Sequence, residues 1–427
     1  MKIAVTGFVA MEAGSVASAN AILLRGLLAR EIEVDFFSKP SFVDPRPAAE
    51  GHPRFRFVDC TNHQADQTRR RLAKIPVMGS AALRWDVASY NHLLVHRIRE
   101  EQRRRGYDLV LWMGDYARGR VPGVPTVSFV QGPPGTDARS IIERGFEIRR
   151  LAGLMAWLKW RVLALLRLSR LGLPALHFSD HLIVGSNQSK RTLNQRYEIP
   201  GQRISTLPYP IDLKHFQPPS DLQSPTSEAA EGNGSDPRAG EQPPGLRILW
   251  LGRIIPRKRL DLFLDGAALA IQRGLDISIT IVGRIGLIPG YEKLISAFPY
   301  PQRLAWHQSV PRANVPELMR CHDVMVQPSD EENFGSSVAE AQACGLPVIV
   351  GRTNGNADYL SARDIHLAND GPDTFALALE EMTRKKQRGE LADPAESRRC
   401  AERYFDPDSL CNRLLAILET VVREGAG

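Results

Sequence analysis

Two glutamates in the C-terminal half form the pattern best suited to chemistry. Glu332 and Glu340 lie eight positions apart in EENFGSSVAEAQACGLPVIV, residues 331–350. This spacing predicts Glu332 on a loop and Glu340 about two turns into the following helix. From the loop, a carboxylate can accept hydrogen bonds from sugar hydroxyls. The second carboxylate can face the same site and accept bonds from both hydroxyls of a ribose.

Between the two glutamates, Asn333, Phe334, Gly335 and Ser336 precede and begin the predicted helix. The first backbone N–H groups of a helix have no intrahelical partner, and the helix dipole adds positive potential there. Such donors suit an anion. The pattern therefore predicts a site for a sugar joined to a pyrophosphate. The alternative is an ordinary strand–loop–helix–strand unit with acidic residues on its surface.

A second pattern, of basic residues, opens the C-terminal half in ILWLGRIIPRKRLDLFLDGAALA, residues 248–270. Arg253 follows the predicted strand after one glycine, and Lys258 comes five positions later, before an apolar helix. A guanidinium and an ammonium at the end of a strand can clamp a diphosphate and stabilise its charge as it leaves. The alternative is ordinary surface placement of both side chains.

The elements that must position these residues follow an alternating pattern. Short, continuous apolar runs alternate with helical patterns, which predicts parallel sheets covered by helices on both faces. In the first half the predicted strands are 3–6, 34–37, 109–113, 126–130 and 182–185, and in the second half 248–251, 277–282, 324–327 and 348–350. We therefore expect an α/β protein with two Rossmann-like domains whose sheets face each other across a cleft, where ligands bind beyond the strand ends.

Composition divides the chain into parts. Residues 217–245 are rich in Pro, Gly, Ser and acids, which predicts a disordered linker. We expect an acceptor-binding domain over 1–216 and a nucleotide-sugar-binding domain over 246–402. The remaining residues, 403–427, form an amphipathic helix that could cross back to the first domain.

Charge and cysteine content narrow the class of protein. The net charge of +7 arises from +13 in residues 1–216 and −6 in the remainder. A basic half suggests an anionic partner, either a membrane or a phosphorylated acceptor, although an Arg-rich surface without a partner is the alternative. We expect no nucleic acid, since no recognised binding module occurs. Five scattered cysteines without a CxxC pair predict neither zinc nor disulfides, which suits the cytoplasm.

One apolar segment, residues 151–171, carries basic residues near its middle. Such charges oppose a membrane-spanning helix. Trp157 and Trp160, together with the basic residues, suit a helix lying in a membrane interface, which would make the protein peripheral on the inner face of the membrane. The alternative is a core helix with basic ends.

With the two patterns combined, the chain resembles family 4 of the retaining GT-B-fold glycosyltransferases, also called glycosyl transferases group 1. The resemblance rests on GRIIPRKRLD, VQPSDEENFG and EAQACGLPVIV, in the family's order and spacing, and it extends over nearly the whole length. It implies transfer of a hexosyl group from a nucleotide-diphosphate sugar to a glycan, lipid-linked or small-molecule hydroxyl, as in polysaccharide biosynthesis. No cofactor or metal is expected.

The resemblance also implies roles for particular residues. Arg253 and Lys258 would bind the diphosphate, Glu332 the donor sugar and Glu340 the ribose. Backbone around Phe334, Gly335 and Ser336 would hold the sugar and phosphates. Three further positions complete the predicted site: Gly14 and Ser15 in the glycine loop of the first half, and Gly283 near the nucleoside.

The chain departs from the family pattern in the first half, where Gln131 replaces a frequent histidine and Pro208-Tyr209-Pro210 replaces the usual Pro-Asn-Gly turn. Gln131 can hydrogen-bond a sugar hydroxyl but cannot shuttle a proton. These changes bear on the acceptor, not the donor. Two other functions stay open: a sugar-nucleotide epimerase or hydrolase of the same architecture, and a non-catalytic carbohydrate- or membrane-binding relative.

Overall fold

The computed structural model describes residues 1–10, 15–40, 44–62, 67, 79–114, 117–132, 135–168, 174–219, 245–286, 288 and 290–425. Most of the predicted linker, along with Gly14, lies outside this part of the chain. The described residues form two compact units. The first contains 1–134, 170–210 and 407–427, and the second contains 135–169 and 211–406.

The first unit is a parallel sheet of seven strands in the order β3-β2-β1-β4-β5-β6-β7. Its strands are β1 (Lys2–Gly7), β2 (Glu33–Ser38), β3 (Phe55–Asp59), β4 (Leu109–Met113), β5 (Thr126–Val130), β6 (His181–Val184) and β7 (Ile204–Thr206). The helices are α1 (Ser15–Ala29), α2 (Arg46–Ala49), α4 (Gly79–Arg105), α8 (Pro174–Phe178), α9 (Asn187–Tyr197) and α16 (Pro407–Gly425). The central strands β1 and β4 are almost wholly buried, which explains their continuous apolar sequence.

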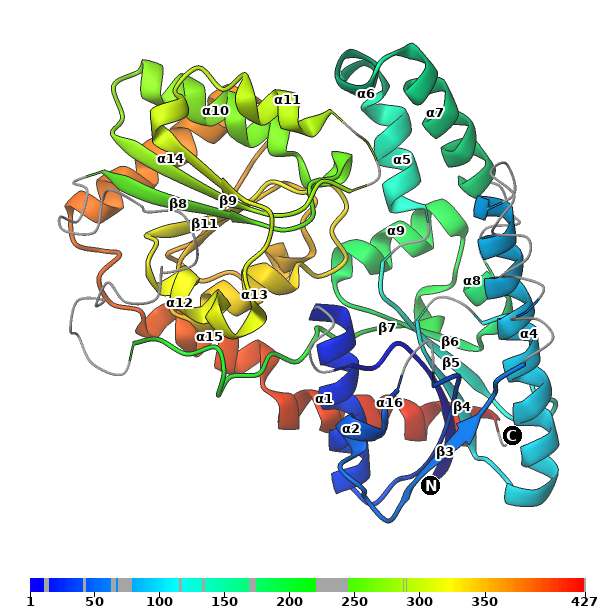
Figure 1. The fold of residues 1–427 in the computed structure, drawn as a ribbon. Helices are drawn as coiled ribbons and strands as arrows, with labels where there is room; N and C mark the ends of the chain where they lie inside the picture. The colour runs from blue at the N-terminus through cyan, green and yellow to red at the C-terminus, as the bar shows by residue number, and fades with distance from the viewer. Residues whose placement is uncertain are drawn as a thin grey trace. The chain divides into compact units, whose positions relative to one another are not determined.

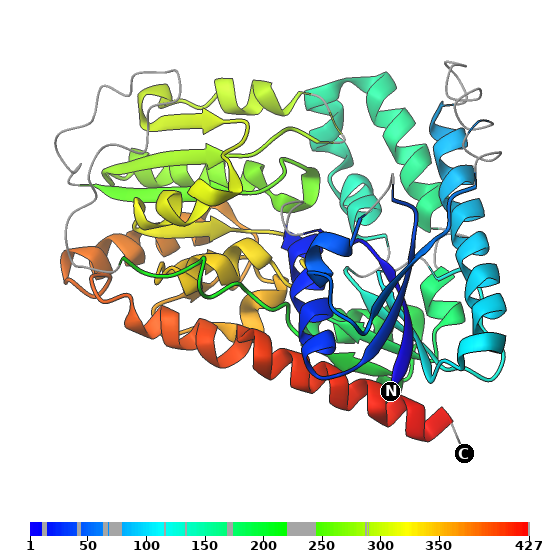
Figure 2. The same cartoon turned by 60° about the horizontal axis from the view of Figure 1, so that its bottom comes forward.

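The last helix of the chain packs in the first unit, against α1 (Figure 2). A Cβ built on Gly26 of α1 would lie 2.0 Å from Cys411 Sγ, so a glycine is needed for this close approach. Beside it, Arg30 Nε donates to Asn412 Oδ1 at 2.6 Å. The residues after 406 thus return to the first sheet's helical layer.

The second unit is a parallel sheet of six strands in the order β10-β9-β8-β11-β12-β13 (Figure 1). Its strands are β8 (Leu246–Leu251), β9 (Ile277–Val282), β10 (Leu304–His307), β11 (Val324–Gln327), β12 (Val348–Val350) and β13 (Ile365–His366). The following helices cover it: α10 (Leu260–Gln272), α11 (Tyr291–Ser296), α12 (Val315–Arg320), α13 (Ser336–Ala343), α14 (Pro372–Gln387) and α15 (Ala395–Phe405). Strands β9 and β10 follow β8 on one side of the sheet, and β12 and β13 follow β11 on the other side. Because β8 and β11 pair directly, the loops that follow these two strands start next to each other.

Three helices from the middle of the chain belong to the second unit: α5 (Thr136–Glu143), α6 (Gly145–Ala152) and α7 (Leu154–Leu168). The predicted boundaries assigned them to the domain over 1–216. The physical reason for the difference is packing, because Ile148 and Leu151 are buried in the same apolar core as β8 and α10. In the described residues, no helix is long and apolar enough to cross a membrane.

Candidate functional site

Lys258 and Glu332 meet in the second unit although 74 positions separate them. Lys258 ends a short 3-10 turn, Pro256–Lys258, after β8, and Glu332 lies on the loop after the neighbouring strand β11. Lys258 Nζ donates to Glu332 Oε2 at 2.5 Å. The parallel order of β8 and β11 thus brings the basic loop and the acidic loop together at one edge of the sheet.

Arg257 is a second cation on the same carboxylate, and the sequence patterns did not single it out. Its Nη1 donates to Glu332 Oε2 at 2.7 Å, and its Nε donates to Asp137 Oδ1 at 2.6 Å. Burial opposes ionisation of Glu332, but Arg257 and Lys258 outweigh it and lower the pKa of Glu332 to about 2. Glu332 is therefore an ionised acceptor at neutral pH. Within the described residues, its Oε1 has no hydrogen-bond donor.

Arg253, predicted to form the diphosphate clamp with Lys258, is exposed and makes no ion pair or hydrogen bond within the described chain. Its guanidinium is near enough to Lys258 to help lower the pKa of that ammonium, although burial is the largest cause. The structure thus places Arg253 near Lys258 but does not pair it with Glu332.

Loop residues 333–336 enter helix α13 through a left-handed turn. Gly335 has φ +81°, and a Cβ built on it would lie 2.8 Å from Gln327 Oε1 and 3.0 Å from Asn354 Oδ1. Only glycine therefore fits without strain. Asn333 and Ser336 are buried on either side of this turn. The start of α13 is thus held tightly, close in sequence to Glu332.

The side chain of Phe334, whose backbone was predicted to contact the ligand, lies in the core. Its ring is 1% exposed and packs edge-on against Tyr359 and Phe405, with centroids 6.1 and 5.2 Å away. The side chain therefore anchors the loop in the core, which leaves only the backbone of this residue for a ligand.

Glu340 projects from α13 and pairs with a different cation from Glu332. Arg312 Nη2 donates to Glu340 Oε1 at 3.1 Å. Burial raises the pKa of Glu340, and Arg312 opposes that rise. The two glutamates thus have distinct partners, which the motif alone did not predict.

Gly283, at the end of β9, lies against the loop that follows β8. A Cβ built on it would lie 1.9 Å from Gly252 O, so the two backbones approach too closely for any side chain. Gly283 N donates to His307 O at 2.9 Å, and Gly283 O accepts from Trp306 Nε1 at 3.0 Å. Both backbone polar groups of Gly283 therefore already have partners within the protein.

The loop carrying Glu332 is braced by arginines that the sequence reading also missed. Arg144 Nη2 donates to Asp330 Oδ2 at 2.9 Å, and Arg139 Nε donates to Glu331 Oε2 at 2.8 Å. Glu331 has φ +44°, a left-handed conformation that is uncommon for glutamate. These ion pairs, with Arg257 and Asp137, tie helices α5 and α6 to the loop. No local sequence motif signals such long-range pairs.

In the first unit, the predicted residues are only partly described. Ser15 begins α1, but its side chain, like all of Gly14, lies outside the described residues. Gln131, after β5, donates from Nε2 to Met113 O at 3.3 Å. Its amide thus bridges the ends of β5 and β4.

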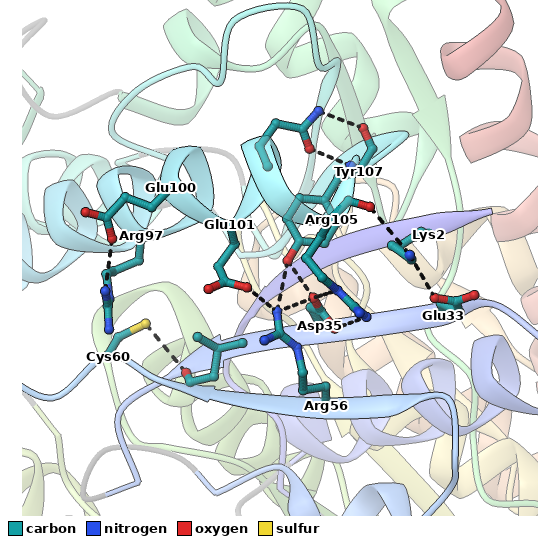
Figure 3. A network of polar contacts seen from close by, with 12 residues as sticks. Lys2, Glu33, Asp35, Arg56, Cys60, Arg97, Glu100, Glu101, Arg105 and Tyr107 are labelled. Carbon is teal, nitrogen blue, oxygen red and sulfur yellow. Dashed lines mark hydrogen bonds and ion pairs between the residues drawn. The ribbon is translucent and has the colours of Figure 1, made fainter.

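A buried carboxylate in the first unit, Asp35 on β2, forms the network in Figure 3. It is 2% exposed and accepts hydrogen bonds from Arg56 Nη2 and Tyr107 Oη at 2.5 Å and from Arg105 Nε at 3.2 Å. Burial opposes ionisation, but these donors lower the pKa of Asp35. Its three partners come from β3 and from the end of α4 and the residues after it. The network is a structural brace, since Asp35 lies within a strand and not at its carboxyl end.

In the part of the chain that the structure describes, no group of three or more His, Cys, Asp or Glu side chains is placed to hold a metal ion.

Comparison with known proteins identifies the family. Residues 17–215 match the model of Glycosyltransferase Family 4, and residues 237–399 match that of Glycosyl transferases group 1. A D-inositol 3-phosphate glycosyltransferase of Thermomonospora curvata is 25% identical over 250 residues, which are 56% of each chain. The enzyme of that name from Arthrobacter sp. is 32% identical over 42% of this chain and 40% of its own. The chain thus matches about half the length of these relatives.

Solved structures show the same fold at low identity. Anabaena HepE in complex with UDP has a TM-score of 0.64 at 16% identity, with 98% of this chain and 100% of the other covered. Sucrose-phosphate synthase from Thermosynechococcus elongatus has a TM-score of 0.63 at 16% identity, with 99% and 100% covered. Together, the two matched models and the two parallel sheets show that the chain belongs to the family 4 glycosyltransferases of the GT-B type.

Proposed function

We propose that the protein transfers a hexosyl group from a nucleotide-diphosphate sugar to a hydroxyl acceptor, with retention at the anomeric carbon. The observation that carries the proposal is the convergence of Lys258, Arg257 and Glu332 beside the start of α13. Two cations and a helix start favour a diphosphate, and an adjacent ionised carboxylate favours sugar hydroxyls.

Each group has a proposed role in the reaction. Lys258 and Arg253, with backbone amides near Gly335, stabilise the negative charge that builds on the departing diphosphate. Glu332 positions the sugar through Oε1, which has no donor within the described chain. Glu340 accepts hydrogen bonds from the ribose hydroxyls. Because Arg312 also donates to the Glu340 carboxylate, Arg312 must share or release it.

A front-face route accounts for retention in this proposal. The bond from the anomeric carbon to the diphosphate oxygen breaks while the acceptor oxygen bonds to the same face. The acceptor's proton passes to the departing diphosphate oxygen. Glu332 is a poor nucleophile, because a carboxylate with a pKa of about 2 that is shared by two cations is weakly basic and donates its electron pair poorly.

Different observations support the proposed identity of the donor and of the acceptor. Fold neighbours were solved with UDP and UDP-glucose, so UDP-glucose is the first donor to test. The matched relatives are named for inositol 3-phosphate, and the first unit, residues 1–134, 170–210 and 407–427, carries a net +8. We therefore assign the acceptor to the first unit and expect it to be anionic, whether a phosphorylated small molecule or a lipid-linked glycan. Peripheral membrane contact through residues 151–171 also stays a prediction.

The test is a donor-by-acceptor screen read by mass spectrometry, with NMR of the product's anomeric proton. We expect an acceptor-dependent product that keeps the donor's anomeric configuration. Lys258→Met should abolish it, whereas Lys293→Met, at an exposed lysine on α11, should not. Sugar or epimer released without acceptor would instead show a hydrolase or epimerase. UDP binding without any turnover would show a non-catalytic relative.

A further inference from the structure

The exposed large apolar side chains of the described chain are gathered almost entirely in one place. Six of the seven lie on α6 and α7: Phe146, Leu154, Met155, Leu158, Val162 and Leu165, which are 47–84% exposed. The seventh, Leu377, lies alone on α14. Scattered apolar residues on a surface are ordinary, but a contiguous group marks an interaction site.

Helix α7 has two distinct apolar faces. At 100° per residue, Leu154, Met155, Leu158, Val162 and Leu165 fall within an arc of about 100°. On another side of the same helix, Ala164 is buried, and Trp157, Trp160 and Leu168 pack on the core of the second unit. The exposed face is therefore additional to the face that holds the helix in place.

Along α7 and the end of α6 the charges have one sign, and Glu147, beside Phe146, is half-buried and accepts from Tyr291 Oη at 3.5 Å. No acidic residue occurs from 148 to 168, whereas five basic residues do. Arg149, Arg150 and Lys159 are exposed, and the Arg161 guanidinium lies over the Trp157 ring, 5.4 Å from the ring centroid. Apolar side chains bordered by cations complement a membrane surface, where acyl chains lie beneath anionic headgroups.

The structure changes which residues would make this contact. The sequence suggested Trp157 and Trp160 as interfacial anchors, but both are largely committed to the core. The exposed aliphatic side chains and Phe146 take their place (Figure 1 shows α6 and α7 adjacent). Helix α7 has 15 residues, so its exposed face would lie along a bilayer and not cross it.

We propose that the exposed face of α6 and α7 docks on an anionic lipid bilayer, with Leu158 and Val162 near its centre and the basic side chains at its border. The one-signed charge favours this occupant over a second copy of the chain, since two such faces would repel each other. The proposal does not depend on sugar transfer, because its test reads binding alone.

Co-sedimentation of the full chain with vesicles tests the proposal. We expect binding to phosphatidylcholine vesicles containing phosphatidylglycerol, and much weaker binding to phosphatidylcholine alone, since each basic residue near an anionic surface adds about fivefold. Leu158→Asp with Val162→Asp should reduce binding at least about tenfold. The matched control is Leu377→Asp, which places the same charge at an isolated exposed leucine and should bind as the unaltered protein does.

Three results would overturn the proposal. One is absence of binding to either vesicle. Another is an equal loss of binding in Leu377→Asp. The third is a concentration-dependent dimer in sedimentation equilibrium that Leu158→Asp dissociates, without vesicle binding. If the double aspartate variant loses its folded circular dichroism signal, Arg150→Glu with Lys159→Glu gives a second reading, and unchanged binding to anionic vesicles would also contradict the proposal.

Discussion

Replacing Lys258 and replacing Glu332 should affect stability unequally, although the two side chains are partners. Glu332 Oε2 accepts from both Lys258 Nζ and Arg257 Nη1, at 2.5 and 2.7 Å. Arg257 also bonds to Asp137 at 2.6 Å. In the described chain, Lys258 has no other acidic partner. Each variant therefore leaves a different set of charges without a partner.

The loss of folding free energy in each variant can be estimated from these contacts. Lys258→Met leaves Glu332 paired with Arg257, so only one charged hydrogen bond is lost, about 1.5–3 kcal/mol. Glu332→Gln leaves the Lys258 ammonium, whose side chain is 12% exposed, without a carboxylate. Breaking a buried pair in this way costs about 3–5 kcal/mol. For a unit of this size, each kcal/mol lowers the Tm by about 2–4 °C.

Differential scanning calorimetry at neutral pH provides the measurement, with Lys293→Met as the control at an exposed lysine. We expect Glu332→Gln to lower the Tm of the second unit clearly more than Lys258→Met does. Combining Lys258→Met with Glu332→Gln should cost less than Glu332→Gln alone, because no buried cation is then unpaired. Equal losses from the two single variants, or a double variant equal to their sum, would refute this reasoning.

Three further predictions concern rate, pH and backbone. Lys258→Met should lower kcat about 100–1000-fold in a UDP-release assay, because it removes a cation from the departing diphosphate; an unchanged kcat would eliminate that role. Because the pKa of Glu332 is lowered from 4.5 to about 2, its stabilising contribution is complete above about pH 4.5 and is lost as pH falls toward 2. The acid unfolding of Glu332→Gln should lack this pH-dependent contribution to stability. Identical acid-unfolding curves for the variant and the unaltered protein would contradict the prediction. Gly335→Ala should lower stability by about 1–3 kcal/mol, measured by urea unfolding, since it combines φ +81° with a crowded Cβ position; a neutral effect would show that the loop adapts.

The sequence predicted the central strands of both sheets well but missed the outer ones. Strands β1, β4 and β11 are mostly apolar runs because both faces are buried. By contrast, β10 is partly exposed along its length, and its residues, LAWH, lack that signature. A strand at the edge of a sheet needs less apolar surface, so its sequence carries less information.

For the site, the sequence identified Lys258 and Glu332 because each follows the end of a strand. It could not identify Arg257, since nothing in RIIPRKRLD distinguishes one arginine from another. The short 3-10 turn at Pro256–Lys258 decides which cations point to the carboxylate. Likewise, the braces from Arg139 and Arg144 depend on α5 and α6 packing in the second unit, a tertiary contact that no local pattern records.

The ion pairs of Glu332 suggest an order for donor binding. Lys258 and Glu332 neutralise each other through a direct hydrogen bond. A diphosphate carries more negative charge than one carboxylate, so it would compete with Glu332 for the ammonium. As Lys258 turns to the diphosphate, Glu332 keeps Arg257 as its partner and stays ionised and in place to accept sugar hydroxyls. With Arg257 as a second partner, binding of the diphosphate to Lys258 would also leave the Glu332 carboxylate in position for the sugar. In a single Lys–Glu pair, the same event would leave the glutamate without a partner.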